Sequence, residues 1–150
     1  MAIARGAGTE IIRSAHFEDI DSTARALIYG VQHHVYTVLS VIMYANAVNA
    51  AGDFGQLYLL GYDTTAGTTA QNIYILNHDF NLYDTFVWND KFSFNGTEPT
   101  DFGSPPLSTV AEQDLIADQA TATSQSLQCI SAAATDNFHV IITYIDQNNA

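Results

Sequence analysis

The amino-acid sequence predicts an all-β protein, an antiparallel β-sandwich of about eight strands in a jelly-roll pattern. The first indication is a long apolar run, His33–Asn46 (HHVYTVLSVIMYAN), which is rich in β-branched and aromatic residues and contains neither Gly nor Pro. The second is a similar run near the end of the chain, Asn137–Asp146 (NFHVIITYID). The third is a series of short strand-like segments joined by short polar connections, without long amphipathic helical periods.

The run His33–Asn46 has two apolar faces if its side chains alternate regularly. One face would carry Val35, Thr37, Leu39, Val41 and Met43, and the other Tyr36, Val38, Ser40, Ile42 and Tyr44. Neither face suits water, so we expect this strand to be covered on both sides. One face would close the core and the other would meet a second copy of the chain. Its expected neighbour in the sheet is Asn137–Asp146.

The other strands are shorter. Two of them form an expected hairpin around the polar turn Thr64–Ala70, and Tyr83–Asn95 is expected as one strand or as a bent pair with its kink at Asn89-Asp90. Gly30 is a candidate bulge. The predicted segments are Glu10–Phe17, Arg25–Val31, Gln56–Asp63, Gln71–Asn77, Tyr83–Asn95 and Ser126–Ala134, with a polar turn at Glu18–Thr23.

The 150 residues fit a single β-sandwich domain, 1–150, with two additions. Residues 1–9 (MAIARGAGT) form a small, Gly-rich N-terminal arm. Residues 96–125 contain all three prolines and form a long loop insertion, which is unusual in a compact domain unless it has a function. The spacing of Thr109 and Glu112 is that of a helix capping box and predicts a short helix over Val110–Ala120.

The composition excludes several classes of protein. Hydrophobic residues make up 47% of the chain and charged residues only 13%, which excludes intrinsic disorder. The formal net charge of −12 argues against a nucleic-acid partner, because phosphate backbones would repel it. No signal peptide and no membrane span are expected from the sequence. Cys129 is the only cysteine, so it cannot form a disulfide within the chain and is expected to be a buried apolar side chain.

The histidines do not form an evident metal site in the sequence. His33 and His34 are adjacent, and adjacent residues of a strand point to opposite faces. His34 and His139 could meet across paired strands, but polar residues at strand ends are the favoured interpretation of the histidines. The other histidines are His16 and His78. We therefore expect no metal site.

The acidic residues are expected to serve turns. Glu18, Asp19 and Asp21 lack the glycine and the distal glutamate of a calcium loop, so they are interpreted as a solvated turn. The spacing of Asp79, Asp84 and Asp90 does not define a pair of catalytic carboxylates. No nucleophile motif or phosphate-binding loop is present in the sequence. We expect no catalytic residue, no cofactor and no enzymatic activity.

Trp88 is the only tryptophan, and it is expected to lie in the core of the sandwich. The alternative is a stacking platform for a sugar, as in a lectin. Eight Tyr and eight Phe, many of them in predicted strands, are also suited to large packed interfaces.

Three segments resemble a group of small β-sandwich virion structural proteins of tailed bacteriophages, which are similar to capsid decoration (cement) proteins. The matching positions are Tyr36–Val41 (YTVLSV), Thr85, Val87, Asn89–Lys91 and Val140–Asp146 (VIITYID). The resemblance covers roughly residues 30–95 and 125–146 and leaves out Gly96–Ser124. It marks strands and not an active site.

The resemblance implies a capsid decoration protein on the exterior of the virion, bound to the major capsid protein and forming a homo-oligomer, most simply a trimer. The alternative is a tail-associated adaptor or a carbohydrate- or receptor-binding module that uses Trp88. For the decoration protein, the arm and the insertion are the expected contact elements, together with tyrosines of the central strand. The candidate interface residues are Ile3, Arg5, Tyr36, Tyr44, Phe102, Pro105, Pro106 and Leu107.

Overall fold

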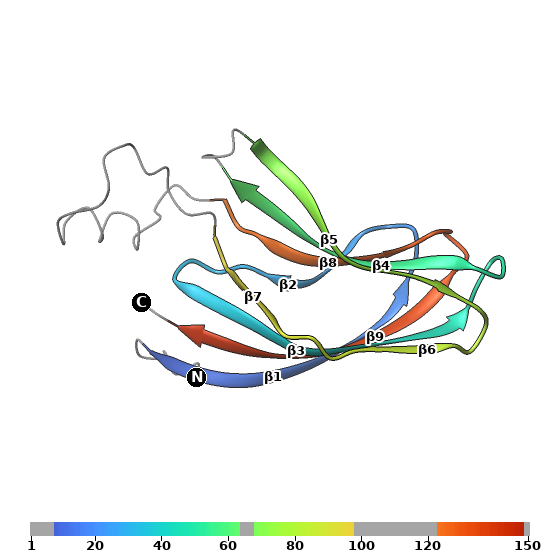
Figure 1. The fold of residues 1–150 in the computed structure, drawn as a ribbon, viewed down its shortest axis with the longest axis horizontal. Coiled ribbons are helices and arrows are strands. Elements are labelled where there is room, and N and C mark those ends of the chain that lie inside the picture. The colour runs from blue at the N-terminus through green and yellow to red at the C-terminus, as the bar shows by residue number, and fades with distance from the viewer. Residues whose placement is uncertain (1–7, 64–67, 98–122, 149–150) are drawn as a thin grey trace.

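Two antiparallel β-sheets face each other in the protein (Figure 1). The computed structural model describes residues 8–63, 68–97 and 123–148. These residues form nine strands and no helix, which confirms the predicted all-β sandwich. The predicted helix Val110–Ala120 lies outside the described residues. The strands are β1 (Thr9–Ile20), β2 (Arg25–Tyr29), β3 (His34–Ala47), β4 (Asp53–Asp63), β5 (Thr68–Phe80), β6 (Thr85–Trp88), β7 (Phe92–Asn95), β8 (Ser126–Ser131) and β9 (Asn137–Asn148).

The first strands of the chain pair with the last ones, and the middle strands pair with each other. Strand β1 pairs with β9, β2 with β8, β3 with β6 and β7, and β4 with β5, all antiparallel. The first sheet has the order β1-β9-β3-β6, with β7 also on β3, and the second has the order β2-β8-β4-β5. This nested pairing, folded over into two layers, is the arrangement of a jelly roll.

The central strand β3 pairs with β9 along nearly its whole length, as the two apolar runs predicted. The regular alternation predicted for β3 is wrong, because the register shifts between Val38 and Ser40. A bulge at Leu39 lets Val38 and Val41 both face the core, although they are three residues apart. The core-facing positions of β3 are therefore Tyr36, Val38, Val41, Met43 and Ala45, each at most 3% exposed.

Strands β6 and β7 are one interrupted edge strand. Both run antiparallel to β3, and the register changes by one residue between the pairs Val41–Trp88 and Val38–Phe92. The break falls at 89–91, as expected from Asn89-Asp90. The indole of Trp88 packs against the core, and its Nε1 donates a hydrogen bond to the carbonyl oxygen of Asp90 at 2.8 Å. This confirms that Trp88 is a core-contacting residue.

The core lies between the two sheets and is apolar. Phe80 and Phe138 are fully buried, with ring centroids 5.0 Å apart. Cys129 is also fully buried, as predicted, and burial raises the pKa of its thiol to about 12. The other buried residues of the cluster are Ile20, Leu27, Ile28, Tyr36, Val38, Val41, Met43, Ala45, Leu57, Leu76, Phe94, Leu127, Val140 and Ile142.

The two ends of the long segment between β7 and β8 are held together. Thr97 forms an isolated β-bridge with Ser124, and the backbone amide of Gln125 donates to the carbonyl oxygen of Gly96 at 3.0 Å. The buried Gln125 side chain accepts from the Tyr62 amide at 3.2 Å and donates to the Asn95 carbonyl oxygen at 3.0 Å. Gln125 therefore anchors this segment to both sheets.

Gly30 lies in this anchor and not in a bulge, which corrects its predicted role. The register of β2 shifts between Ala26 and Ile28, before Gly30, and strand β2 ends at Tyr29. The amide of Gly30 donates to the Gln125 carbonyl oxygen at 2.8 Å. The backbone of Gly30 can approach this closely because it carries no β-carbon.

The described ends of the chain lie at the same end of the sandwich as this anchor (Figure 1). The amide of Gly8 donates to the carbonyl oxygen of Asn148, and Asn148 pairs with His34 on β3. The amide of Gly96 in turn donates to the His34 carbonyl oxygen at 2.7 Å. The described residues contain no helix that is long and apolar enough to cross a membrane.

Candidate interaction surface and histidine cluster

The outer face of the five-stranded sheet carries a band of aliphatic side chains. Because β1, β9, β3 and β6 pair side by side, residues opposite one another on these strands share this face. Ile42 lies opposite Ile141 on β9 and Val87 on β6. Val87 is 48% exposed and Ile141 41% exposed, and farther along the face Ile12 is 70% exposed.

The outward positions of β9, β3, β6 and β7 contain no Asp, Glu, Lys or Arg within the described residues. The polar side chains on this face are largely hydroxyls that bond to one another. The hydroxyl oxygens of Ser14 and Thr143 lie 3.2 Å apart across β1 and β9. Those of Thr37 and Ser93 lie 2.8 Å apart across β3 and β7. The central strands of this face are therefore uncharged, although the whole chain has a net charge of −12. Charged residues of the described chain border it on β1 and, as Asp90 and Lys91, between β6 and β7.

The outer face of the four-stranded sheet differs in composition. Tyr58 and Gln128 lie opposite each other there, and the tyrosine hydroxyl donates to the Gln128 Oε1 at 2.9 Å. Burial raises the pKa of Tyr58. Tyr74 is a neighbour of Tyr58, with ring centroids 5.8 Å apart, and is 61% exposed. Amides and phenol groups predominate on this face, whereas branched aliphatic side chains predominate on the other.

A row of aromatic and imidazole rings crosses the far end of the five-stranded sheet. The Tyr83 and Tyr44 rings stack with centroids 6.4 Å apart, and the Tyr44 and His139 rings are perpendicular with centroids 6.1 Å apart. His139 in turn lies 5.4 Å from the ring of His16 on β1. Tyr44, a candidate interface residue, is thus half-buried on the outer face.

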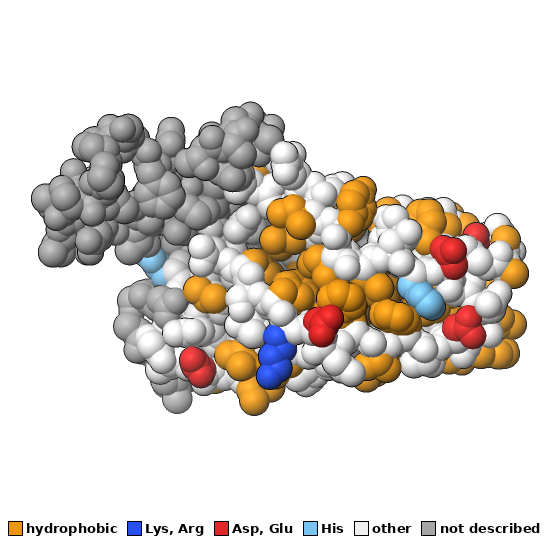
Figure 2. Space-filling model, in the orientation of Figure 1, with side chains coloured by type: hydrophobic (Ala, Val, Ile, Leu, Met, Phe, Trp, Pro, Cys, Tyr) orange, Lys and Arg blue, Asp and Glu red, His pale blue; other side chains and the backbone are white. Residues whose placement is uncertain are grey.

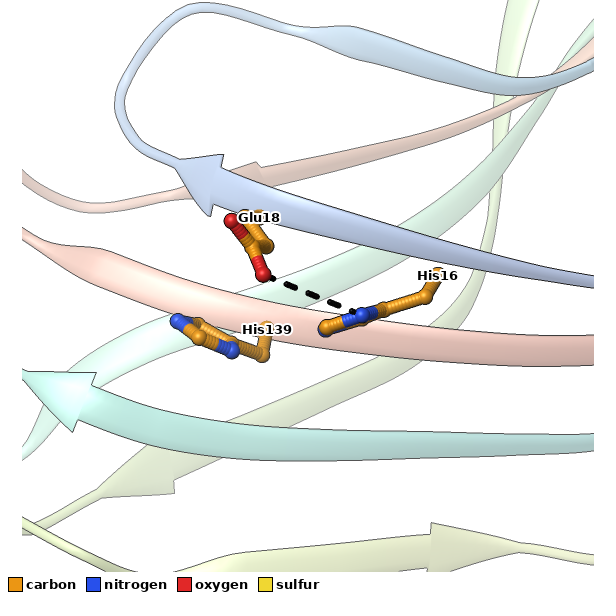
Figure 3. Close-up of side chains that lie close together, drawn as sticks. All are labelled: His16, Glu18 and His139. Carbon is orange, nitrogen blue, oxygen red and sulfur yellow. Dashed lines mark ion pairs between the residues drawn. The ribbon is translucent and has the colours of Figure 1, made fainter.

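His16, Glu18 and His139 converge at the β1 end of this row (Figure 3). One ligand atom from each side chain lies within 4.8 Å of the others, and the His16 Nδ1 is 3.9 Å from a Glu18 carboxylate oxygen. The prediction that ended the first strand at Phe17 is wrong, because β1 continues to Ile20. Glu18 is consequently a strand residue on the same face as His16 and not part of a turn.

His34 and His139 do not meet, contrary to one interpretation of the sequence. His34 pairs with Asn148 and His139 pairs with Tyr44, near opposite ends of β3. The antiparallel register separates two residues that each lie near the start of their own strand.

Asp146 joins His34 to Arg13 at the other end of the sheet. Asp146 is 4% exposed and accepts hydrogen bonds from the Arg13 Nε at 3.0 Å and the His34 Nδ1 at 2.6 Å. The three residues come from β9, β1 and β3, so the carboxylate ties three strands together. This cluster is structural, because its carboxylate is buried and already hydrogen-bonded to the side chains of Arg13 and His34.

Tyr36 lies beside this cluster, in the core. It is 3% exposed, so its side chain faces the opposite sheet and not the surface, which corrects its expected place at an interface. Burial, with a smaller effect of Asp146, raises its pKa to about 12. The reason is the alternation of β3, which points Tyr36 and Val38 to the same side. Of the other candidate interface residues, Ile3, Arg5, Phe102, Pro105, Pro106 and Leu107 lie outside the described residues.

Several acidic residues stabilise turns. The Asp21 carboxylate accepts from the Thr23 amide at 2.7 Å, and the Asp84 carboxylate accepts from the Asn81 amide at 2.8 Å. Asp19, which has a positive φ of 58°, accepts a hydrogen bond from the Asn137 side chain. These contacts match the expected turn roles of Asp21 and Asp84.

No protein-family model matches the chain, and no curated protein sequence is significantly similar to it. Among solved structures, a chain of Bacillus endospore appendages, described as a novel family of disulfide-linked pili, aligns with 100% of this chain and 97% of its own length. The identity is 11% and the TM-score 0.39. A chain of T=1 particles derived from infectious bursal virus aligns with 99% of this chain, at 10% identity and a TM-score of 0.38. This chain covers 38% of that viral chain. Likeness at this level assigns neither a family nor a function.

Proposed function

We propose that the protein is a structural subunit of a bacteriophage virion, which decorates the exterior of the head as a homo-oligomer and reinforces the capsid lattice. The observation that carries this proposal is the aliphatic, uncharged outer face of the five-stranded sheet, where Ile12, Val87 and Ile141 are exposed. An uncharged face with several exposed large aliphatic side chains is typical of a surface that is covered by a protein partner. The resemblance to phage decoration proteins supports the choice of partner.

A second copy of the chain is the occupant that this face fits best. Two copies with a net charge of −12 repel each other wherever their acidic side chains approach. The outward positions of β9, β3, β6 and β7 avoid this repulsion, because the described residues place no charged side chain there. Glu10 and Glu18 lie only at the β1 edge. Copies can therefore meet over the centre of the sheet without burying an unpaired charge.

The dimensions of the face are adequate for a stable contact. A strand of 12 residues such as β9 extends about 40 Å, and neighbouring strands lie about 4.8 Å apart. The face across the sheet is therefore of the same order as the about 800 Å² that each partner buries in a standard protein interface. Each Å² of apolar surface removed from water contributes about 25 cal/mol, and repetition over a shell multiplies that effect.

The contact with the major capsid protein is proposed for residues 1–9 and 96–125. Both segments leave the sandwich at one end, where Gly8 bonds to Asn148 and Thr97 pairs with Ser124. An oligomer that joins its copies through the sheet face would leave this end available for the capsid.

The first experiment is the solution mass of the purified protein, measured by light scattering after size exclusion, with co-sedimentation on heads that lack the protein. A trimer that co-sediments with heads is the expected result. A monomer that does not bind heads would refute the decoration role and would favour a tail-associated adaptor or a carbohydrate- or receptor-binding module.

A glycan screen separates these remaining alternatives. The position of Trp88 does not favour a sugar platform, because its indole packs on the core and its Nε1 already bonds to the Asp90 carbonyl oxygen. Specific glycan binding that is lost in a folded Trp88→Phe variant would nevertheless assign the carbohydrate-binding role.

A further inference from the structure

We infer that His16, Glu18 and His139 form a binding site for a divalent transition-metal ion, of which Zn²⁺ is the best fit. The three ligand atoms lie within 4.8 Å of one another, from two neighbouring strands (Figure 3). Two imidazole nitrogens and one carboxylate oxygen are a ligand set that zinc uses in proteins. The inference concerns the single chain and does not depend on the proposed virion role.

The backbone brings these side chains together without distortion at His16. On β1, residues 16 and 18 lie two apart, so both point to the outer face of the sheet. On β9, the register pairs Phe17 with Val140 and then shifts before Ile20 pairs with Phe138. His139 therefore lies on the neighbouring strand opposite residues 18 and 19, and diagonal to His16, which pairs with Ile141. The Tyr44 ring, perpendicular to the imidazole of His139, packs against it from the β3 side.

The separations of the three ligand atoms, all within 4.8 Å, exceed those around a coordinated ion by at most about 1.4 Å. Zinc binds imidazole nitrogen at about 2.0–2.1 Å and carboxylate oxygen at about 2.0–2.2 Å, so tetrahedral ligands lie about 3.4 Å from one another. The His16 Nδ1 and the Glu18 oxygen are 3.9 Å apart. Rotation of the Glu18 side chain, which is 62% exposed, is sufficient to close that difference.

The chemistry of the site selects among cations. Calcium and magnesium prefer oxygen ligands only, and two imidazoles favour zinc, copper or nickel instead. The net charge of −12 raises the local concentration of any cation near the surface. Three protein ligands leave at least one coordination position for water, and this position faces solvent because the His16 side chain is 47% exposed.

The test is calorimetric titration of the metal-stripped, tag-free full chain with Zn²⁺. We expect one saturable site per chain. We expect His16→Ala and Glu18→Gln each to weaken binding by more than about tenfold, since the loss of even a group that only orients a ligand costs about that much. Both side chains are exposed, so these variants should fold as the wild type does, which far-UV circular dichroism checks.

His33→Asn is the matched control. It also removes one imidazole, but from a turn residue with a φ of 64° that asparagine tolerates, and His33 is not part of the cluster. Its Zn²⁺ affinity should equal that of the wild type. The absence of saturable binding to the wild type would overturn the inference, and so would equal affinities of the wild type and His16→Ala.

Cobalt gives a readout that depends on ligand geometry. The wild type loaded with Co²⁺ should show the visible absorption bands of a low-coordinate complex. These bands should disappear when Zn²⁺ replaces Co²⁺, and the His139→Gln variant should not show them. Bands that persist in both His139→Gln and His16→Ala would place the ion elsewhere and refute this site.

Discussion

Gly30 and Gly96 lie backbone to backbone, so that a β-carbon on Gly30 would sit 1.7 Å from the Gly96 carbonyl oxygen and 2.5 Å from that of Gln125. Gly30→Ala should therefore separate the end of β2 from the anchor of the long segment. We expect the free energy of unfolding to fall by about 3 kcal/mol, as in severe overpacking. Urea denaturation measures this change.

Gly52→Asn is the comparison for this variant. Gly52 has a φ of +88°, but an added β-carbon would meet no atom within 4 Å. Because asparagine tolerates positive φ, the cost should stay below about 1 kcal/mol. Equal costs at Gly30 and Gly52 would show that the close approach at Gly30 does not limit stability.

Asp146→Asn should destabilise the fold through the three strands that its carboxylate joins. The side-chain amide of asparagine keeps one acceptor oxygen, but it lacks the negative charge of the carboxylate that contacts Arg13 and His34. Hydrogen bonds to charged groups contribute about 1.5–3 kcal/mol each, and we expect a loss in that range. Thermal unfolding should show it, whereas the exposed Asp90→Asn should change stability by less than about 0.5 kcal/mol.

Alkaline pH should destabilise the protein, because a buried thiol and a buried phenol resist losing their protons in the folded state. Burial raises the pKa of the Cys129 thiol from 9.0 to about 12, and burial, with Asp146, raises that of Tyr36 from 10.0 to about 12. The unfolded chain therefore releases these protons at lower pH than the folded chain does. The stability is fully present below about pH 9 and is lost as the pH rises toward 12.

Cys129→Ala isolates the contribution of the thiol. Its stability should be lower at neutral pH, because it leaves a small cavity, but should fall less steeply between pH 9 and pH 12. Denaturant midpoints measured across this range test the prediction. A wild type and a variant with parallel pH profiles would contradict it.

Ile141→Lys should break the proposed contact between copies. Ile141 lies on the outer face of the five-stranded sheet and is 41% exposed, so a lysine there places a charge in the centre of the face without entering the core. We expect the solution mass to fall to that of one chain. Tyr74 lies on the outer face of the other sheet and is 61% exposed. The variant Tyr74→Lys should therefore leave the mass of the oligomer unchanged.

The features of the fold that could be predicted from the sequence are those that depend on the local pattern of apolar and turn-forming residues. The runs around β3 and β9 were predictable as neighbours because both are long and apolar, but the register that places Ile42 opposite Ile141 was not. The break at 89–91 was predictable from Asn89-Asp90. By contrast, the bulge at Leu39 was not, because both faces of β3 are apolar and a slip of one residue leaves the pattern equally hydrophobic.

The histidine cluster required information on register. His16 and Glu18 are two residues apart, a local signal that could have been recognised in an extended strand. His139, however, is more than a hundred positions away, and only the pairing of β1 with β9 brings it to the cluster. The polar residues Glu18, Asp19 and Asp21 predict a turn and a strand end at Phe17, and this prediction separates Glu18 from the strand face that carries His16.

The neighbouring positions of β1 and β9 determine how the domain would respond to a pull on its two described ends. Gly8 and Asn148 lie side by side, so tension between them acts across the ladder and opens its hydrogen bonds one after another, beginning at Gly8. Such peeling needs little force at any moment, whereas sliding two strands lengthwise would load all their bonds at once. The contact of Arg13 with Asp146, a few residues from the opening end, is therefore one that a mechanical load would have to break early.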